Sequence, residues 1–234
     1  MARTGAIIVA GGSGIRCGGA LPKQFALLGG IPVLARTINA VAAALPGAEI
    51  VAVLPERHAD FWKNLAARFE VAPHTIVTGG AERFDSVRRG LAALRTDPEL
   101  IAVRPLVSAE LIRRVAEAAE RYGAAIPVVE AVDSLREVEE QRTETEGIAA
   151  SHVADRRRFR IVQTPQIFRA DILRGAYGAE YRAEFTDDAS VVEAAGHGVF
   201  LARGERGNLK ITTAEDFILA EALLAAREEG AERE

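Results

Sequence analysis

Short apolar runs alternate with longer amphipathic stretches along most of the chain. A first apolar run over 6–9 leads through a glycine-rich loop into a helical pattern over about 32–45. Strands that are apolar throughout and are separated by helices are typical of a mostly parallel sheet covered on both faces, so the predicted fold class is α/β. The same alternation predicts further strands over 50–54, 75–78, 100–103, 125–129 and 199–202, and further helices near 59–69, 84–94, 108–122, 170–181, 187–195 and 214–227, the last with Thr213 as its N-cap.

One segment breaks this alternation. Residues 133–162, DSLREVEEQRTETEGIAASHVADRRRFRIV, are too polar for a buried core and alternate too regularly for a simple linker. The segment therefore predicts two strands joined by a charged turn. A chain of 234 residues fits one domain, 1–234, that carries this insertion.

Composition and charge exclude several classes of protein. The chain is 49% hydrophobic and 26% charged, with a formal net charge of -4, as is ordinary for a globular protein. No block of like charges is long enough to attract nucleic acid or an anionic membrane, and no apolar run approaches the ~20 residues of a membrane-spanning helix. The single cysteine, Cys17, cannot form an internal disulfide and the N-terminus shows no signal-peptide pattern, so we expect a cytoplasmic protein.

The glycine-rich stretch over 10–19 is the strongest candidate for a phosphate-binding loop. It follows a predicted strand directly, and its glycines allow backbone N–H groups to approach a phosphate. The pattern G-x-G-x-x-G fails because Cys17 stands at the last glycine, and no Gly-Lys-Ser/Thr closes a P-loop. Arg16 and Lys23 flank the stretch in a chain with three lysines, which suits a polyphosphate, whereas a tight turn with solvated charges is the alternative.

Weaker clusters elsewhere combine cations with hydrogen-bonding groups. Gly79 and Gly80 follow a predicted strand, where ligands bind in open α/β sheets, although a plain helix N-terminus would also explain them. Asp155-Arg156 before the QTPQ stretch, and the stretch NLKITT over 208–213, show the same combination. The histidines lack metal-ligand spacing and no nucleophile elbow is present, so the residues indicate phosphate transfer by positioning and charge.

Five motifs in order carry a resemblance over nearly the whole chain. They read AGGSGIRCGGALPKQF, GGAERFDSVRRGL, DRRRFRIVQTPQIFR, TDDASVVEAAG and GNLKITTAEDFILAEALL. In this order the chain resembles the 2-C-methyl-D-erythritol 4-phosphate cytidylyltransferase family of the non-mevalonate isoprenoid pathway. The resemblance implies a Rossmann-like nucleotidyltransferase domain with a protruding β-arm, matched by 133–162, through which two copies dimerise. It also implies transfer of CMP from CTP to a sugar-alcohol phosphate, with release of pyrophosphate and a requirement for Mg²⁺.

The resemblance assigns two groups of residues to CTP. Arg16 and Lys23 match the cations that stabilise the charge developing on the CTP phosphates. The others match either the loop around the nucleotide, at Ala10, Gly11, Gly12 and Gly14, or the turn that meets the cytosine and ribose, at Gly80, Arg83 and Ser86.

The resemblance assigns a third group to the acceptor. Arg156 and Lys210 match the residues that position the acceptor phosphate for attack, and Ser134 stands where the family commonly has a threonine in the arm. A phosphate monoester has a second pKa of about 6 and is already a good nucleophile near neutral pH, so the reaction needs no side-chain base.

The chain departs from the family at 100–107, which reads LIAVRPLV. Four residues, H-D-A-A, are absent between Val103 and Arg104, and their aspartate is the family's expected contact to magnesium and substrate. The metal ligands of this chain are therefore unknown. Either the sequence omits a mobile loop, which we favour because the flanking residues match the family, or the deletion is real and impairs magnesium binding and turnover.

Two alternatives to the main interpretation stay open. Ribitol-5-phosphate cytidylyltransferases share the glycine loop, the PKQF segment and the QTPQ turn, but TDDAS over 186–190 and the stretch 214–216 favour the methylerythritol enzyme. A non-catalytic, nucleotide-binding dimer is the better interpretation if the deletion is real. CTP binding is expected in both cases, and only turnover separates them.

Overall fold

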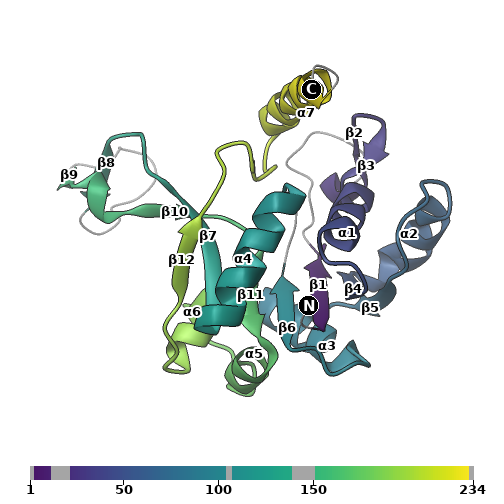
Figure 1. Ribbon diagram of the computed structural model, residues 1–234, viewed down its shortest axis with the longest axis horizontal. Coiled ribbons are helices and arrows are strands. Elements are labelled where there is room, and N and C mark those ends of the chain that lie inside the picture. The colour runs from purple at the N-terminus through teal and green to yellow at the C-terminus, as the bar shows by residue number, and fades with distance from the viewer. Residues whose placement is uncertain (1–2, 12–21, 104–106, 139–150, 232–234) are drawn as a thin grey trace.

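The computed structural model describes residues 3–11, 22–103, 107–138 and 151–231, and shows one large sheet between two layers of helices (Figure 1). The strands follow the order β10-β7-β11-β6-β1-β4-β5, with β12 also beside β7. Every strand of this sheet except β10 and β11 runs in the same direction, which confirms the predicted α/β fold with a mostly parallel sheet. Their bounds are β1 (Thr4–Val9), β4 (Glu49–Leu54), β5 (Thr75–Thr78), β6 (Leu100–Val103), β7 (Ala124–Glu130), β10 (Arg160–Val162), β11 (Gln166–Arg169) and β12 (Phe200–Arg203).

The core lies on both faces of the sheet because side chains alternate along each strand. In β1, Ala6 and Ile8 are buried against one layer of helices, and Ile7 between them is buried against the other. The first layer consists of α1 (Val33–Ala44), α2 (Ala59–Ala66) and α4 (Ala109–Tyr122), and the second of α3 (Arg83–Ala93), α5 (Ala170–Ala176) and α6 (Asp188–Ala194). The last helix, α7 (Ala214–Ala231), lies beside β2 at the margin of the domain (Figure 1).

Two short pairings were not predicted from the sequence. β11 lies between β6 and β7 and runs antiparallel to both. Its four residues are too few to show a hydrophobic period, and the first three are buried only because distant strands enclose them. The other pairing is a hairpin of β2 (Leu27–Leu28) and β3 (Ile31–Pro32), joined by Gly29 and Gly30 at φ values of 54° and 73°. Positive φ at both turn residues is what a two-residue hairpin requires.

Two helices are shorter than predicted. The helices expected near 59–69 and 170–181 end at Ala66 and Ala176. In the first case, Glu70 adopts a φ of 47°, which is incompatible with a continuing right-handed helix. The remaining boundaries agree with the predicted ones to within a few residues.

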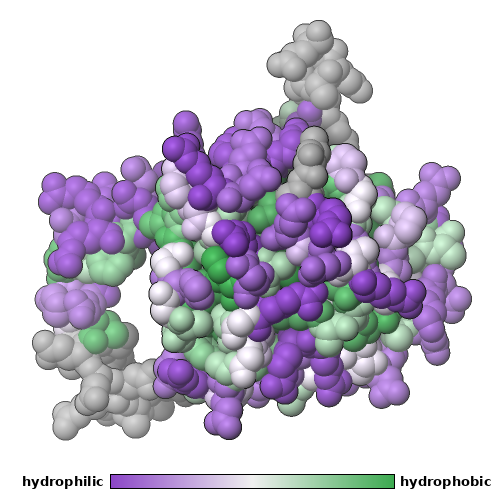
Figure 2. All heavy atoms as spheres, turned by 60° about the horizontal axis from the view of Figure 1, so that its bottom comes forward, coloured by the Kyte–Doolittle hydropathy of each residue, from purple (hydrophilic) through white to green (hydrophobic). Residues whose placement is uncertain are grey.

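The segment 133–162 forms a projecting hairpin and one strand of the main sheet. β8 (Leu135–Val138) and β9 (Ser151–Ala154) pair antiparallel in a sheet of their own. Arg160–Val162, expected in the arm, instead pairs with β7 as β10. The hairpin stands away from the body of the molecule, and Figure 2 shows an opening between part of it and the body. The charged stretch 139–150 lies outside the described residues.

The single tryptophan packs against the short turn that follows the glycine-rich stretch. Trp62 is fully buried, and its ring stacks at 6.0 Å from that of Phe25, the last residue of a 3₁₀ turn over Lys23–Phe25. The indole N–H donates to His74 Nε2 at 2.9 Å, while His74 Nδ1 lies 2.8 Å from the carbonyl of Ala72. His74 therefore carries its proton on Nδ1 when it is neutral.

Across the described part of the chain, no helix combines the length and the apolar character needed to cross a bilayer.

Candidate active site

Two predicted nucleotide segments leave the sheet from neighbouring strands. Ala10 and Gly11 follow β1, and Gly80 follows β5. Both segments are tied to β4, which lies between them: the Ala10 N–H donates to the carbonyl of Val53 at 2.9 Å, and the Gly79 N–H donates to that of Leu54 at 2.8 Å. The carboxyl ends of parallel strands share one edge of the sheet, which is the usual ligand position in this class of fold.

The described start of the glycine loop is anchored by a buried glutamine. Gln24 Nε2 donates to the carbonyl of Ala10 at 2.9 Å. Gly11 is exposed, and an added Cβ would meet no atom of the described residues within 4 Å. The other candidates of this loop, Gly12, Gly14 and Arg16, lie outside the described residues.

Lys23 connects this region to the distant segment that carries Lys210. Its ammonium group donates to the carbonyl of Ile211 at 2.9 Å, across 188 positions of sequence. Lys23 is half-buried, whereas the neighbouring Lys210 is exposed. Two predicted phosphate-binding segments that are far apart in the sequence are therefore adjacent in the fold.

The turn after β5 is shaped by its own side chains. The Gly80 N–H donates to Ser86 Oγ at 3.1 Å, and the same hydroxyl donates to the carbonyl of Glu82 at 3.1 Å. A Cβ on Gly80 would lie 2.2 Å from the Cβ of Asp85, so this position requires glycine. Arg89 also donates to the carbonyl of Gly79 at 2.7 Å. Gly80 and Ser86, both predicted at the nucleotide, thus belong to one compact turn.

Arg83, predicted at the same turn, is engaged by a buried acid. Its guanidinium forms an ion pair with the carboxylate of Asp188 in α6, and the exposed fractions of the two side chains are 23% and 1%. Burial is the largest single influence and lowers the pKa of Arg83, but the charge and hydrogen bond of Asp188, together with the hydrogen bond and charge of Tyr177, raise it by more in sum, so the net pKa is above its ordinary value. Arg83 therefore stays positively charged and points toward α6.

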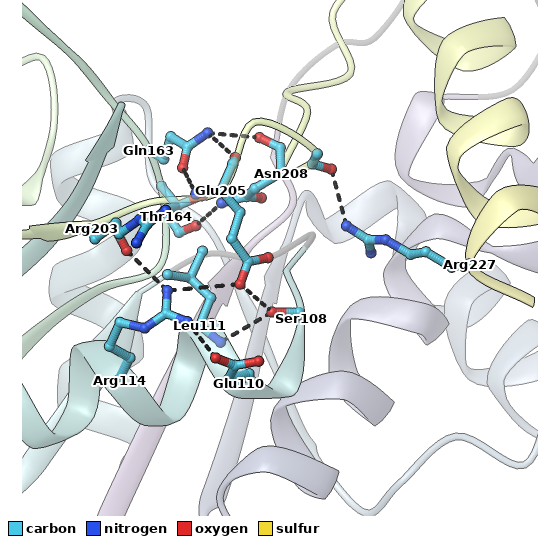
Figure 3. A network of polar contacts seen from close by, with 11 residues as sticks. Ser108, Glu110, Leu111, Arg114, Gln163, Thr164, Arg203, Glu205, Asn208 and Arg227 are labelled. Carbon is cyan, nitrogen blue, oxygen red and sulfur yellow. Dashed lines mark hydrogen bonds and ion pairs between the residues drawn. The ribbon is translucent and has the colours of Figure 1, made fainter. Parts of the chain in front are cut away.

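The loop that leads to Lys210 is fixed to two other elements (Figure 3). Gln163 Nε2 donates to the carbonyl of Glu205 at 2.7 Å, and the Glu205 N–H donates back to Gln163 Oε1 at 3.1 Å. Asn208 Nδ2 donates to the carbonyl of Thr164 at 2.7 Å. Ser108, the N-cap of α4, donates from its hydroxyl to the Glu205 carboxylate at 2.8 Å. The loop is thus attached to the start of α4, just after the shortened connection from β6.

Beyond Lys210, the start of α7 is held by Asp216. Its carboxylate accepts from the Thr212 hydroxyl at 2.7 Å and from the N–H groups of Thr212 and Thr213 at 2.6 and 2.8 Å, and these hydrogen bonds lower its pKa to about 2. The Asp216 N–H donates to Thr213 Oγ1 at 3.3 Å, which confirms Thr213 as the predicted N-cap. Lys210 therefore lies between two fixed stretches of backbone.

The remaining acceptor candidates lie at the base of the projecting hairpin. Arg156 lies in a 3₁₀ turn over Arg156–Arg158 and donates to the carbonyl of Val132. Ser134 is exposed directly before β8. Since Leu135 pairs with Ala154, Ser134 and Arg156 both flank the first pair of the hairpin.

Comparison with known proteins gives the family. The sequence model of 2-C-methyl-D-erythritol 4-phosphate cytidylyltransferase (IspD) matches residues 4–226. The chain belongs to this family. It is 45% identical to the cytidylyltransferase of that name from Bacteroides thetaiotaomicron over 223 residues, which cover 93% of the chain and 98% of the relative. For the relative from Bacteroides fragilis, the identity is 44%, with 96% of this chain and 100% of the relative covered.

Solved structures agree with this assignment. The 4-diphosphocytidyl-2C-methyl-D-erythritol synthase from Anaerococcus prevotii is similar with a TM-score of 0.76 and 27% identity, over 96% of this chain and 99% of that one. The cytidylyltransferase from Thermus thermophilus is similar with a TM-score of 0.68 and 34% identity, over 93% and 97% of the two chains. The predicted resemblance is confirmed by both sequence and fold.

Within the described ranges, the side chains do not form a protein site for the Mg²⁺ that the family implies. In the ranges that the structure describes, no three His, Cys, Asp or Glu side chains are arranged to hold a metal ion. The stretches 12–21 and 104–106, which adjoin the strand ends β1 and β6, contain no Asp or Glu in their sequence. A hard cation such as Mg²⁺ requires oxygen ligands, and these segments supply no carboxylate.

Sequence reasoning did not find the side chains that hold the predicted site residues in place. Gln163 and Asn208 were noted only as hydrogen-bonding groups beside cations, Ser108 only as the start of a predicted helix, Asp188 only as part of the TDDAS motif, and Glu205 carried no signal of its own. Their roles depend on contacts between segments that are far apart in the sequence, and local pattern gives no information about such contacts.

Proposed function

We propose that this chain transfers CMP from CTP to 2-C-methyl-D-erythritol 4-phosphate and releases pyrophosphate. The observation that carries the proposal is the contact from Lys23 to the carbonyl of Ile211, in a chain of this family. It joins the end of the glycine loop to the Lys210 segment at the edge of the sheet where ligands bind in this class of fold. A donor triphosphate and an acceptor phosphate would meet between these two segments.

The nucleotide occupies the loop after β1 and the turn after β5 in this proposal. The compact Gly80–Ser86 turn provides a preformed surface for the base and ribose, while Arg16 and Lys23 face the triphosphate. Positive charge at fixed positions stabilises the transition state of phosphoryl transfer, in which negative charge spreads over the phosphate oxygens and the leaving group. Lys23 suits this role because its ammonium group is already held in place.

The acceptor supplies its own nucleophile. An oxygen of the phosphate dianion attacks the α-phosphorus of CTP, and the bond from that phosphorus to the bridging oxygen of the β-phosphate breaks. Pyrophosphate leaves with that electron pair, and no side chain needs to remove a proton. Two anions repel each other strongly, so Lys210 and Arg156 would be required to bring the acceptor close.

Magnesium enters this proposal as part of the substrate, the magnesium complex of CTP. Mg²⁺ commonly keeps several waters and binds to substrate phosphates rather than to an all-protein cage. The lack of a carboxylate cluster in the described ranges fits that arrangement, and no step here is assigned to a metal held by the protein.

We also propose that the reaction takes place in the cytoplasm. A single cysteine, which cannot form an internal disulfide, is typical of proteins from reducing compartments. Fractionation of the native host, with the protein detected by antibody, tests this location.

The test of the activity is a pyrophosphate-release assay with CTP and Mg²⁺. Methylerythritol phosphate and ribitol phosphate are supplied side by side, and CTP binding is measured separately by calorimetry. We expect steady release with methylerythritol phosphate. Faster release with ribitol phosphate would favour the ribitol enzyme, and CTP binding without release from either acceptor would favour a non-catalytic dimer.

Lys210→Ala and Arg156→Ala are expected to weaken use of the acceptor more than binding of CTP. Each removes one cation from the acceptor side, so the acceptor KM should rise by about 10-fold or more, while the CTP Kd changes little. Arg157→Ala is the matched control, because Arg157 lies in the same 3₁₀ turn but pairs with Asp155. A collapse of CTP affinity in Arg156→Ala, with acceptor KM unchanged, would reverse the assignment.

We propose that two copies of the chain form a homodimer through the segment 133–162. An isolated two-stranded sheet is marginally stable, and this one and the adjoining strand expose Val138, Val153 and Ile161. Replacing 139–150 by a two-residue Asn-Gly turn should yield monomers with little activity. Sedimentation velocity and the release assay check this together, and a wild-type monomer at micromolar concentration with normal turnover would contradict it.

A further inference from the structure

The buried carboxylate of Asp188 joins the nucleotide turn to Tyr177, the residue that ends α5. Asp188 is at the start of α6, and its side chain is 1% exposed. One carboxylate oxygen accepts from the guanidinium of Arg83, and the other accepts from the Tyr177 hydroxyl at 2.6 Å. Burial and the nearby Asp188 charge both raise the pKa of Tyr177, so its hydroxyl keeps its proton and remains a donor.

The backbone of Asp188 continues this network to the centre of the sheet. The N–H groups of Asp188 and Ala189 donate to Gln166 Oε1 at 3.1 and 3.0 Å, and Gln166 Nε2 donates to Asp187 at 2.7 Å. Gln166 is the register partner of Val103, the last residue of β6. The contacts therefore run from the first residue of α3 to the end of β6.

The first turn of α3 is held at two successive residues. Arg83 is bound by Asp188, and the ring of Phe84 stacks on that of Tyr177 with centroids 4.7 Å apart. This first helical turn is part of the Gly80–Ser86 turn, in which the Ser86 hydroxyl accepts from the Gly80 N–H. A shift of α3 relative to α6 would therefore change the shape of the turn assigned to the cytosine.

Stability alone does not account for an ion pair at this position. Removing two charges from water is costly, and well-packed apolar residues of similar volume often stabilise a core as well or better. An ion pair also fixes the orientation of the arginine side chain, because a guanidinium binds a carboxylate in few geometries. Arg83 is therefore oriented by α6 and is not available as a freely moving surface cation.

We propose that Asp188 is a positioning residue for the nucleotide: it holds Arg83, and through it the Gly80–Ser86 turn, in the shape that binds CTP. The inference rests on the proposed function, since it takes this turn as part of the CTP site. Asp188 acts through Arg83 without itself touching the nucleotide. Its loss affects CTP affinity and leaves the use of the acceptor unchanged.

The first test is Asp188→Asn, with CTP affinity measured by calorimetry in the absence of acceptor. We expect the CTP Kd to rise by about 10-fold or more, because small displacements of a positioning group have large effects on a bound ligand. The acceptor KM at saturating CTP should change less than about twofold. Asp171→Asn is the matched control, since Asp171 forms an ion pair with Arg169 in which both side chains are more than half exposed.

A second variant separates positioning from folding. Asp188→Asn leaves the Arg83 charge buried without its counter-ion, so the protein could unfold for that reason alone. The triple variant Arg83→Met, Tyr177→Phe and Asp188→Leu replaces the whole network by apolar groups. We expect it to melt within a few degrees of the wild type and still to show the raised CTP Kd. Wild-type CTP affinity in a folded triple variant would overturn the inference.

These affinity measurements also keep the two proposals distinguishable. A wild type that binds CTP without releasing pyrophosphate contradicts the proposed function, whereas the comparison of CTP Kd values among the variants still decides the role of Asp188. If turnover is normal and the triple variant binds CTP as the wild type does, the nucleotide roles of Asp188 and Arg83 are wrong and the proposed function stands.

Discussion

Lys23→Ala is expected to lower kcat by about 100-fold or more and to leave the fold intact. A positioned donor that stabilises developing charge in the transition state is typically worth about 3 kcal/mol, which corresponds to a factor of about 100 in rate. Lys23 is held by the carbonyl of Ile211 at 2.9 Å, so in the proposed role its charge would meet the phosphates with little reorganisation. Steady-state pyrophosphate release and the melting temperature are the two measurements. Arg16→Ala should show the same loss.

Two further variants show whether the charge or the contact matters. Lys23→Gln keeps a donor for the Ile211 carbonyl but removes the charge, and we expect kcat to remain about 100-fold low. Lys63→Ala is the control, because Lys63 is exposed on α2 and pairs with Asp60 at 3.0 Å. Near-normal kcat in Lys23→Gln would reject the electrostatic role and leave only a structural one.

If the deletion is real, insertion of His-Asp-Ala-Ala between Val103 and Arg104 is expected to raise kcat on the order of 100-fold and to create a metal site. The connection from β6 to the N-cap Ser108 spans only 104–107, and none of these four residues is acidic. Four more extended residues add roughly 13 Å of reach and bring one carboxylate to the edge of the sheet. Mn²⁺ binding followed by electron paramagnetic resonance without CTP, and the release assay with Mg²⁺, report the two effects.

An insertion of His-Asn-Ala-Ala isolates the carboxylate from the loop length. It should bind no Mn²⁺ and give little gain in kcat, and equal gains from both insertions would assign the effect to length alone. The intact mass of the purified protein is the companion measurement. A mass that matches the 234 residues means that the deletion is real, and a mass larger by four residues means that the loop is already present.

The sequence predicted the parallel part of the sheet well because its strands are apolar throughout. β1, β4 and β6 each contain a short aliphatic run, and such a run is stable only when both of its faces are covered. β11 could not be predicted in this way. Gln166 and Arg169 stand at its two ends, and its position between β6 and β7 is specified by residues far away in the chain.

The candidate site was predictable to the extent that its parts are contiguous motifs. Gly80 and Ser86 lie in one turn, and the family pattern identifies both. The contact from Lys23 to Ile211 spans 188 positions, and the ion pair from Arg83 to Asp188 spans 105. A polar group that becomes buried needs a hydrogen-bond partner. Which group becomes that partner depends on how the helices pack, and the local sequence does not show this.

The buried indole ring of Trp62 is an intrinsic fluorescence probe of this domain. The chain has a single tryptophan, so its fluorescence arises from one site and needs no label to be assigned. Trp62 stacks on Phe25, two residues from Lys23, and donates to His74. Nucleotide bound at the glycine loop would change the surroundings of Trp62, and so its emission, if it displaces the Lys23–Phe25 turn. Nucleotide association can thus be followed in real time by stopped-flow emission on the unmodified protein.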